Sequence, residues 1–215
     1  MATRSSASKT KIKYVEEYKP IKTILVSQPK PERSPYYDIE KKFGLTIDWR
    51  SFIHVDGVTE KEFRKNRVRP DEYTSIIFCS KNSIENFFRI CDEMRVKMSP
   101  ETKYFCVTEA IANYLQKFIV YRKRKVFYGD NGTNQSLFET IKKDKEQERF
   151  LYPCSESFDS EITNWLSEHN FDYAIPVLYQ VQSTNIKPLL ESKDFQIVCL
   201  FTPLSIKSFL ENDPD

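Results

Sequence analysis

Four apolar segments of this 215-residue chain each end in a hydroxyl residue that is followed by a helix-like apolar pattern. The hydroxyl residues are Ser80, Thr108, Ser155 and Thr202. A Ser or Thr in this position caps the following helix, whose free N–H groups and dipole attract anions. Such turns line the ligand crevice of an open α/β sheet at the carboxyl ends of its strands. The pattern predicts an anion-binding cleft made largely of backbone donors, although ordinary helix caps alone would produce it too.

Two other polar segments offer similar chemistry. Residues 122–125 (Arg-Lys-Arg-Lys) form the most basic run, which is either a solvated face or a source of positive potential for a polyanion. Residues 131–134 (Asn-Gly-Thr-Asn) precede a predicted helix and form either an ordinary loop with a cap or a further set of hydrogen-bond donors. A nucleic-acid site would interleave aromatic residues with the basic run, whereas Tyr121 and Tyr128 only flank it.

Cysteine and histidine residues form no metal or redox motif. The five cysteines are Cys79, Cys91, Cys106, Cys154 and Cys199. No two of them make a C-x-x-C pair, and four lie in apolar runs, where a free thiol behaves as a small hydrophobe. This use of cysteine is typical of a reducing compartment. His54 and His169 stand far apart in sequence and make no zinc signature, so we expect no metal and no other cofactor.

The composition is that of a globular protein with a solvated surface. Hydrophobic residues make up 40% of the chain and charged residues 30%. The net charge of +2 gives no basic excess for binding nucleic acid. Residues 1–20 lack the apolar stretch of a signal peptide, and no segment reaches the roughly 18 apolar residues of a membrane span. We expect a soluble, cytoplasmic monomer with neither a nucleic-acid nor a membrane partner.

Strands and helices that alternate along the chain must position these side chains. The predicted strands are apolar throughout, which indicates burial on both faces. Because helices with apolar residues at i, i+3, i+4 and i+7 follow them, they predict an α/β fold with parallel sheets covered by helices. The strands are expected at residues 23–26, 45–52, 76–79, 104–107, 126–128, 150–152, 174–181 and 197–201. The helices are expected near residues 36–43, 84–91, 111–118, 135–143, 162–166 and 205–210, with Gly44 as a helix stop.

Several of these strand-to-helix segments also carry a resemblance to a known family. The segments are residues 22–27 with 43–45, 76–84 (IIFCSKNSI), 104–112 (YFCVTEAIA), 151–155 (LYPCS), 176–181 (PVLYQV) and 198–205 (VCLFTPLS). Each one alone is weakly specific, whereas their common order and spacing are more specific. Taken together along nearly the whole chain, they resemble the uroporphyrinogen-III synthase family.

The resemblance implies two doubly wound parallel-sheet domains joined by a two-stranded bridge. A discontinuous first domain would hold residues 1–53 and 183–215, and the second would hold residues 58–173. The bridging strands would be residues 54–57 and 174–182. Family members normally continue through a further turn and a final helix, so we expect the C-terminal part of the first domain to be missing from this chain.

The resemblance also implies an activity. Members of the family cyclise the linear tetrapyrrole hydroxymethylbilane to uroporphyrinogen III in haem biosynthesis, with inversion of ring D and loss of water, and without a cofactor. By its place in the matching strand, Tyr179 would be the general acid for the departing hydroxyl, although aromatic residues are common in strands anyway. The implied substrate-binding residues are Ser80, Lys81, Asn82, Ser83, Thr108, Glu109, Ala110, Ser155 and Thr202.

Departures from the family pattern keep other functions open. Thr108 stands where glycine is common and Ile111 where threonine is frequent, and a chain with only four glycines leaves the backbone less free to approach a ligand. The alternative is a non-catalytic relative that binds an anionic ligand or a partner. An unrelated regulatory module of the receiver type would need acidic strand ends, whereas these strand ends carry Ser and Thr.

Overall fold

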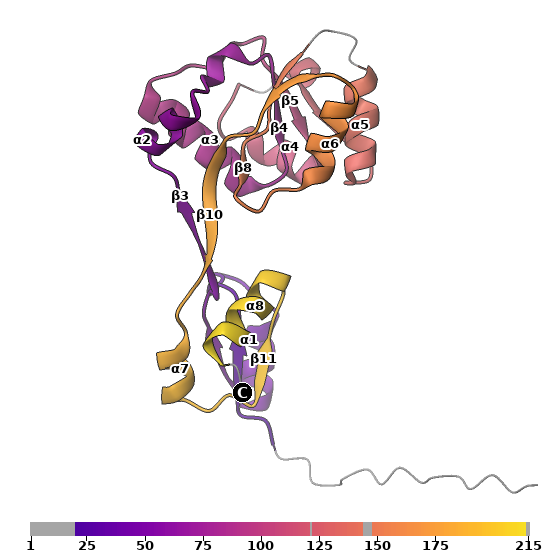
Figure 1. Cartoon of the computed structure of the whole chain (residues 1–215). Helices are drawn as coiled ribbons and strands as arrows, with labels where there is room; N and C mark the ends of the chain where they lie inside the picture. Colours follow the sequence, from indigo (N-terminus) through magenta and orange to yellow (C-terminus); the bar gives the residue numbers. More distant parts are fainter. Residues whose placement is uncertain (1–19, 121, 144–147, 214–215) are drawn as a thin grey trace, which may run out of the picture. The chain divides into compact units, whose positions relative to one another are not determined.

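The computed structural model describes residues 20–120, 122–143 and 148–213. These residues fall into two compact units, and many of their elements are labelled in Figure 1. Unit 1 holds the described residues up to Phe52 and from Asn185 onward, and unit 2 is Ile53–Thr184. Both units combine helices with parallel strands, so the predicted α/β class is confirmed. In the described part of the chain, no helix is both long enough and apolar enough to cross a membrane.

Unit 1 is built on a small parallel sheet with the strand order β11-β1-β2. Its strands are β1 (Thr23–Val26), β2 (Thr46–Trp49) and β11 (Ile197–Cys199). Its helices are α1 (Tyr36–Phe43), α7 (Lys187–Ser192) and α8 (Pro203–Asn212). Leu25, Phe52 and Ile186 are buried at its centre, so distant parts of the chain share one core. Helix α1 ends at Gly44 as predicted, with a left-handed φ of 63° that favours glycine.

Unit 2 contains a five-stranded parallel sheet with the order β6-β5-β4-β7-β9. The strands are β4 (Ser75–Phe78), β5 (Lys103–Cys106), β6 (Val126–Tyr128), β7 (Arg149–Leu151) and β9 (Asp172–Ala174). The main helices are α3 (Lys81–Met94), α4 (Glu109–Leu115), α5 (Asn134–Lys143) and α6 (Ser160–Glu168). Every residue of β4 and β5 is buried, both the apolar residues that predicted the strands and the polar Ser75 and Lys103 at their starts.

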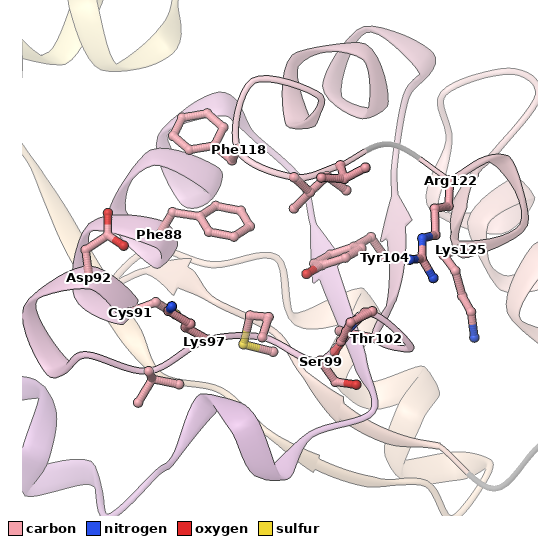
Figure 2. A pocket seen from close by; sticks show the side chains of 15 residues that line it. Phe88, Cys91, Asp92, Lys97, Ser99, Thr102, Tyr104, Phe118, Arg122 and Lys125 are labelled. Atoms are coloured by element: carbon pink, nitrogen blue, oxygen red, sulfur yellow. The ribbon is translucent and has the colours of Figure 1, made fainter.

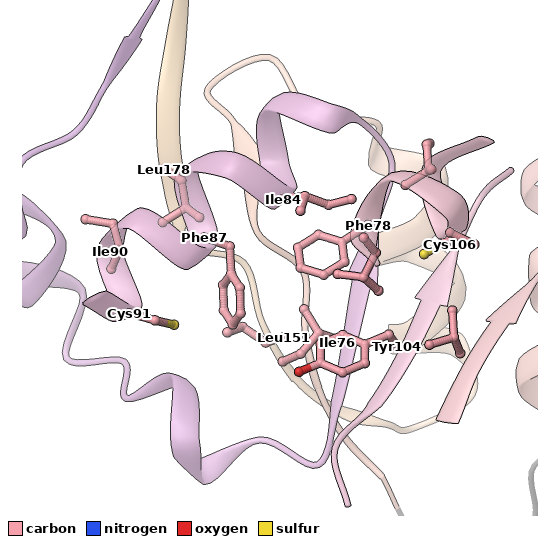
Figure 3. Close-up of a cluster of buried hydrophobic side chains, with 14 of the residues drawn as sticks. Ile76, Phe78, Ile84, Phe87, Ile90, Cys91, Tyr104, Cys106, Leu151 and Leu178 are labelled. Atoms are coloured by element: carbon pink, nitrogen blue, oxygen red, sulfur yellow. The ribbon is translucent and has the colours of Figure 1, made fainter. Parts of the chain in front are cut away.

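Alternate residues of the central strands enter two separate cores. Ile76 and Phe78 pack with side chains of α3 and α4 on one face of the sheet (Figure 3). Ile77 and Phe105 pack with side chains of α5 and α6 on the other. The two sets alternate because successive side chains of a strand point to opposite faces. Each fully buried side chain of this size contributes roughly 1.5–3 kcal/mol, so the strands form a firm frame for the residues at their ends.

A second sheet of unit 2 has the order β3-β10-β8. Its strands are β3 (Ile53–Gly57), β8 (Cys154–Ser155) and β10 (Val177–Ser183). In β10, Tyr179 pairs with Gly57 of the antiparallel β3 and with Ser155 of the parallel β8. The single strand expected at residues 174–181 is therefore wrong. Two strands, β9 and β10, share this segment, because Pro176 between them has no N–H for a ladder.

Other predicted elements differ from the observed ones mainly at their ends. The strand expected at residues 45–52 stops at Trp49, and the one expected at 197–201 stops at Cys199. Both pair with the four-residue β1, which limits their length. The remaining elements are α2 (Glu60–Phe63) and the 3-10 turns Arg64–Asn66, Pro70–Glu72 and Lys123–Lys125.

Candidate functional site

The phenol of Tyr179 is the centre of the candidate site. Strand β10 holds its backbone by pairing on both sides, and the register with β8 shifts between Val177 and Tyr179. The residue is only 6% exposed, and its Oη lies 3.0 Å from the Oγ of Ser80. Either oxygen can donate in this hydrogen bond. The second sheet of unit 2 thus fixes a phenol against the start of α3.

Ser80 is the N-cap of α3, as the sequence predicted. Its backbone is extended, and its Oγ accepts a hydrogen bond from the N–H of Ser83 over 3.0 Å. The Ser83 hydroxyl accepts one from the N–H of Ser80 over 3.3 Å, which completes a reciprocal capping box. The Tyr179 hydroxyl therefore lies beside the N-terminus of a 14-residue helix. The helix dipole there favours negative charge.

Ser155 belongs to the same site, but it does not cap a helix. It lies in β8 opposite Tyr179, and its Oγ donates a hydrogen bond to the carbonyl oxygen of Ser157 over 3.1 Å. The predicted cap role of Ser155 is wrong, since the N-cap of α6 is Asp159, whose Oδ1 accepts from the N–H of Glu161 over 2.9 Å. Pairing with β10 keeps the chain extended at Ser155, so the helix begins only at Ser160.

The surroundings of Tyr179 keep its phenol protonated. Burial raises the pKa of Tyr179 above its ordinary value, while the nearby hydroxyl groups of Ser80 and Ser155 act in the opposite direction without cancelling the rise. The phenol therefore carries its proton at neutral pH. The same hydroxyl groups stabilise the phenolate when the proton leaves. A buried phenol with these neighbours has the properties of a general acid.

A cavity of about 150 Å³ opens beside this hydrogen-bonded group. Its lining comprises Cys79, Ser80, Ser83, Tyr152, Pro153, Cys154, Ser155, Ser157, Phe158, Asp159 and Tyr179. The cavity lies where β4 and β7 end, at the carboxyl edge of the five-stranded sheet, where the sequence predicted a ligand crevice. Within the ranges that the structure describes, no group of three or more His, Cys, Asp or Glu side chains is placed to hold a metal ion.

Seven residues of this lining were not among the predicted site residues, and Tyr152 and Asp159 are two of them. Tyr152 is 2% exposed and lines the cavity together with Cys79; burial raises the pKa of Cys79 to about 12 and also raises that of Tyr152. Asp159 supplies a carboxylate, which accepts a hydrogen bond from the amide of Asn134 over 2.6 Å. The run Asp-Ser-Glu at residues 159–161, just before an apolar helical period, is a cap signal that would have found Asp159.

Two further predicted caps lie at other helix starts. Thr108 caps α4 at the neighbouring strand end, where its Oγ1 accepts from the N–H of Ile111 over 3.3 Å. Among the described residues, however, Thr108 is not part of the lining of the Tyr179 cavity. Thr202 caps α8 in unit 1, where its Oγ1 accepts from the N–H of Ser205 over 3.1 Å. Three of the four predicted caps are therefore confirmed.

The remaining candidates occupy first turns of helices. Lys81 and Asn82 lie at the start of α3, and Glu109 and Ala110 lie at the start of α4. The ammonium of Lys81 stands over the ring of Tyr114, 5.2 Å from its centroid. The exposed carboxylate of Glu109 accepts a hydrogen bond from the Tyr128 hydroxyl over 3.4 Å. The candidates that the structure brings into one cavity are Ser80, Ser83, Ser155 and Tyr179.

The fold and the site define an α/β protein with a polar cavity at the carboxyl ends of parallel strands. A model of the family described as uroporphyrinogen-III synthase HemD matches residues 41–215. The chain therefore belongs to the uroporphyrinogen-III synthase family, and the resemblance seen in the sequence is confirmed.

Solved structures of uroporphyrinogen-III synthases share the fold of this chain. A mutant uroporphyrinogen III synthase from the extremely thermophilic bacterium Thermus thermophilus is 11% identical with a TM-score of 0.59, covering 89% of this chain and 77% of that one. The uroporphyrinogen-III synthetase from Helicobacter pylori is 16% identical with a TM-score of 0.57, covering 89% and 78%. Identities this low show the fold alone. No curated protein matches the chain.

Proposed function

We infer that this chain is a uroporphyrinogen-III synthase. It is a cyclising lyase of tetrapyrrole and haem biosynthesis, which converts hydroxymethylbilane to uroporphyrinogen III with inversion of ring D and loss of water. The family match over residues 41–215 carries this inference, and the likeness to solved synthases supports the fold. The hydrogen bond between Tyr179 and Ser80 supports the assignment of the reacting group.

Tyr179 is the proposed proton donor to the leaving hydroxyl of the substrate. Its O–H bond breaks as the terminal C–O bond of the substrate breaks, water leaves, and an azafulvenium cation remains. The electron-rich ring D attacks this cation to form a spiro-pyrrolenine, which rearranges to the inverted ring. The hydroxyls of Ser80 and Ser155 and the start of α3 stabilise the phenolate meanwhile. The proton that ring closure releases restores the phenol.

Most of the catalytic task is positioning, because the free substrate also closes, to the I isomer. Free N–H groups and hydroxyls at helix starts are proposed to hold the carboxylates of the substrate. The side chain of Lys81 would add a positive charge, whereas Glu109 and Ala110 would contribute backbone N–H groups only. The proposed binding residues are Ser80, Lys81, Asn82, Ser83, Thr108, Glu109, Ala110, Ser155 and Thr202.

We also propose that units 1 and 2 are the two domains of this family. The boundaries expected from the resemblance lie close to the division at Phe52 and Asn185, which supports the proposal. In this reading β3 and β10 are the two bridging strands. The free cysteines of the described residues suit a cytoplasmic protein, and we propose a monomer that works without a cofactor.

The decisive experiment measures which isomer forms. Purified protein is incubated with hydroxymethylbilane, and the III and I isomers are separated after oxidation. The wild type should give mainly the III isomer. A protein that binds substrate and yields only the spontaneous I isomer would be the non-catalytic relative instead.

The first prediction tests the proton donor. Replacing Tyr179 by Phe removes one oxygen from the cavity, and kcat should fall about ten- to a hundredfold, at or below the lower limit for general acids because a phenol is a weak acid. Tyr173→Phe, in β9 and outside the cavity lining, is the matched control and should retain activity. Equal kcat values for the two variants would remove Tyr179 from the mechanism.

A further inference from the structure

Unit 2 has a second and larger cavity, of about 370 Å³, which the proposed function does not use. It lies between the end of α3, the start of β5 and the segment after α4 (Figure 2). Among the described residues, none lines both this cavity and the one beside Tyr179. Its volume falls within the range of about 300–1,000 Å³ that is typical of small-molecule sites.

Aromatic side chains form one wall of this cavity. The rings of Phe88 and Phe118 are stacked with centroids 5.2 Å apart and planes 15° apart. Phe118 is 37% exposed, and Val120 at the edge is 87% exposed, so apolar surface is open to a ligand. Flat apolar groups bind such walls because they bury area and match the ring faces.

Tyr104 supplies a buried polar group in the same cavity. The residue is 4% exposed, and its ring stacks on Phe78 with planes 7° apart, which fixes its direction. Figure 2 shows its hydroxyl pointing into the cavity. Within the ranges that the structure describes, this hydroxyl makes no hydrogen bond to another protein group, and it is open to the cavity. A hydroxyl can both donate and accept, so an oxygen on a ligand could form a hydrogen bond with it there.

Positive side chains prevail at the rim. Lys97, Arg122 and Lys125 line the cavity, against the single carboxylate of Asp92 in its lining. Arg122 and Lys125 form ion pairs with Glu101, at 3.5 Å and 2.7 Å. In the described part of the chain, no hydrogen bond or ion pair holds Lys97. The rim therefore offers a mobile cation to an anionic group of a ligand.

We propose that this cavity is a second ligand site, which binds a planar aromatic carboxylate with a hydroxyl or carbonyl at its far end. The rings lie against Phe88 and Phe118, the far oxygen meets the hydroxyl of Tyr104, and the carboxylate lies at the rim near Lys97. The site is separate from the cyclisation chemistry, so the inference does not depend on the proposed function.

Three probe molecules test each part of this arrangement on the full-length chain. They are 6-hydroxy-2-naphthoate, 2-naphthoate, which lacks the far hydroxyl, and 2-naphthol, which lacks the carboxylate. Titration calorimetry should rank hydroxynaphthoate as the tightest ligand. If neither naphthoate binds at millimolar concentration, or if 2-naphthol binds as tightly as hydroxynaphthoate, the proposal is wrong.

Four variants locate the probe. Tyr104→Phe should weaken hydroxynaphthoate about fivefold, the value of one hydrogen bond, and leave 2-naphthoate unchanged. Val120→Asp, at an exposed position that tolerates charge, should weaken both naphthoates but not 2-naphthol. Lys97→Gln should weaken both naphthoates about threefold, whereas the exposed Lys142→Gln is the matched control without effect.

Two further readouts separate this site from the cyclisation site. Tyr179→Phe should leave naphthoate binding unchanged, and Tyr104→Phe should leave the ratio of III to I isomers unchanged. Loss of binding in Tyr179→Phe would put the probe in the other cavity and overturn the proposal. Unchanged hydroxynaphthoate affinity in Tyr104→Phe, with the fold intact by circular dichroism, would overturn it as well.

Discussion

At the scale of single residues, Ser80 links the stability of a helix to the proposed chemistry. Its Oγ accepts from the N–H of Ser83 and also hydrogen-bonds with Tyr179. A hydroxyl has one proton and two lone pairs, so it can serve both partners at once. The cap holds this oxygen in place, which orients the phenol before any substrate arrives.

The two roles of Ser80 predict two separate losses in Ser80→Ala. Loss of the cap should reduce the free energy of unfolding by about 1 kcal/mol. Loss of the hydrogen bond to the phenolate should reduce kcat about tenfold. Urea unfolding and steady-state kinetics measure the two effects. Thr59→Ala removes a similar capping box at α2, outside the cavity, and should lose stability only.

The raised pKa of Tyr179 predicts how the protein responds to alkali. The phenol is the active form, so kcat should not fall through titration of Tyr179 until the pH exceeds about 10, the ordinary pKa of tyrosine. The stabilisation from the buried neutral phenol is complete below the unfolded pKa and is lost as pH rises through the folded pKa. Phenolate absorbance of the wild type minus that of Tyr179→Phe measures this titration. A midpoint below 10 would contradict the assignment.

At the scale of strands and helices, local sequence patterns predicted the elements and their caps, but not the contacts that depend on strand pairing. The apolar runs and the Ser or Thr caps found β4 with α3, β5 with α4 and β11 with α8, because those signals lie within a few neighbouring residues. The role of Ser155 was mistaken because it depends on pairing with β10. The contact of Ser80 with Tyr179 joins residues 99 positions apart, and no local pattern encodes it. Only the family resemblance indicated Tyr179.

A buried ion pair lies at the amino-terminal ends of the strands of the five-stranded sheet, away from the cavity at their carboxyl ends. The ammonium of Lys103 lies 2.6 Å from the carboxylate of Glu148, whose side chain is 5% exposed. Thr74 and Ser75 also donate hydrogen bonds to this carboxylate. Burial alone would raise the pKa of Glu148, but the hydrogen bonds from Lys103, Thr74 and Ser75 together lower it. These contacts join the starts of three strands.

Removing one partner of this ion pair should destabilise the protein strongly. Lys103→Met leaves a buried carboxylate without its cation, and the free energy of unfolding at pH 7 should fall by about 3–5 kcal/mol. Lys193→Met breaks the more exposed pair with Asp48 and should cost less than about 1 kcal/mol. In the wild type, the contribution of Glu148 is present above its unfolded pKa and is lost as pH falls through the lower folded pKa. Urea unfolding at pH 7 and in acid measures both effects, and equal losses in the two variants would contradict the assignment.

At the scale of the whole molecule, unit 2 is contained within unit 1 along the chain. The chain enters unit 2 after Phe52 and leaves it before Asn185. It enters through β3 and leaves through β10, and these two strands pair with each other in five consecutive positions. The two ends of unit 2 are therefore fixed close together by its own hydrogen bonds.

A self-contained unit should fold alone. Residues 53–184, expressed separately, should show a single cooperative urea transition, because both cores of this unit are formed from its own residues. Tryptophan fluorescence can follow the transition, since Trp165 is buried in one of these cores. A broad, non-cooperative transition would contradict the prediction.

The pairing of β1 with β11 has a consequence for synthesis on the ribosome. The side chain of Thr23 donates to the carbonyl of Asp194, 171 residues later. At about 5–20 residues per second, the first strand emerges roughly 10–30 s before its partner. During that interval unit 2 can complete its fold and β1 can pair with β2, whereas the other side of β1 waits without β11. Until β11 emerges, that side of β1 is an unpaired strand edge, which is the kind of surface through which nascent chains aggregate.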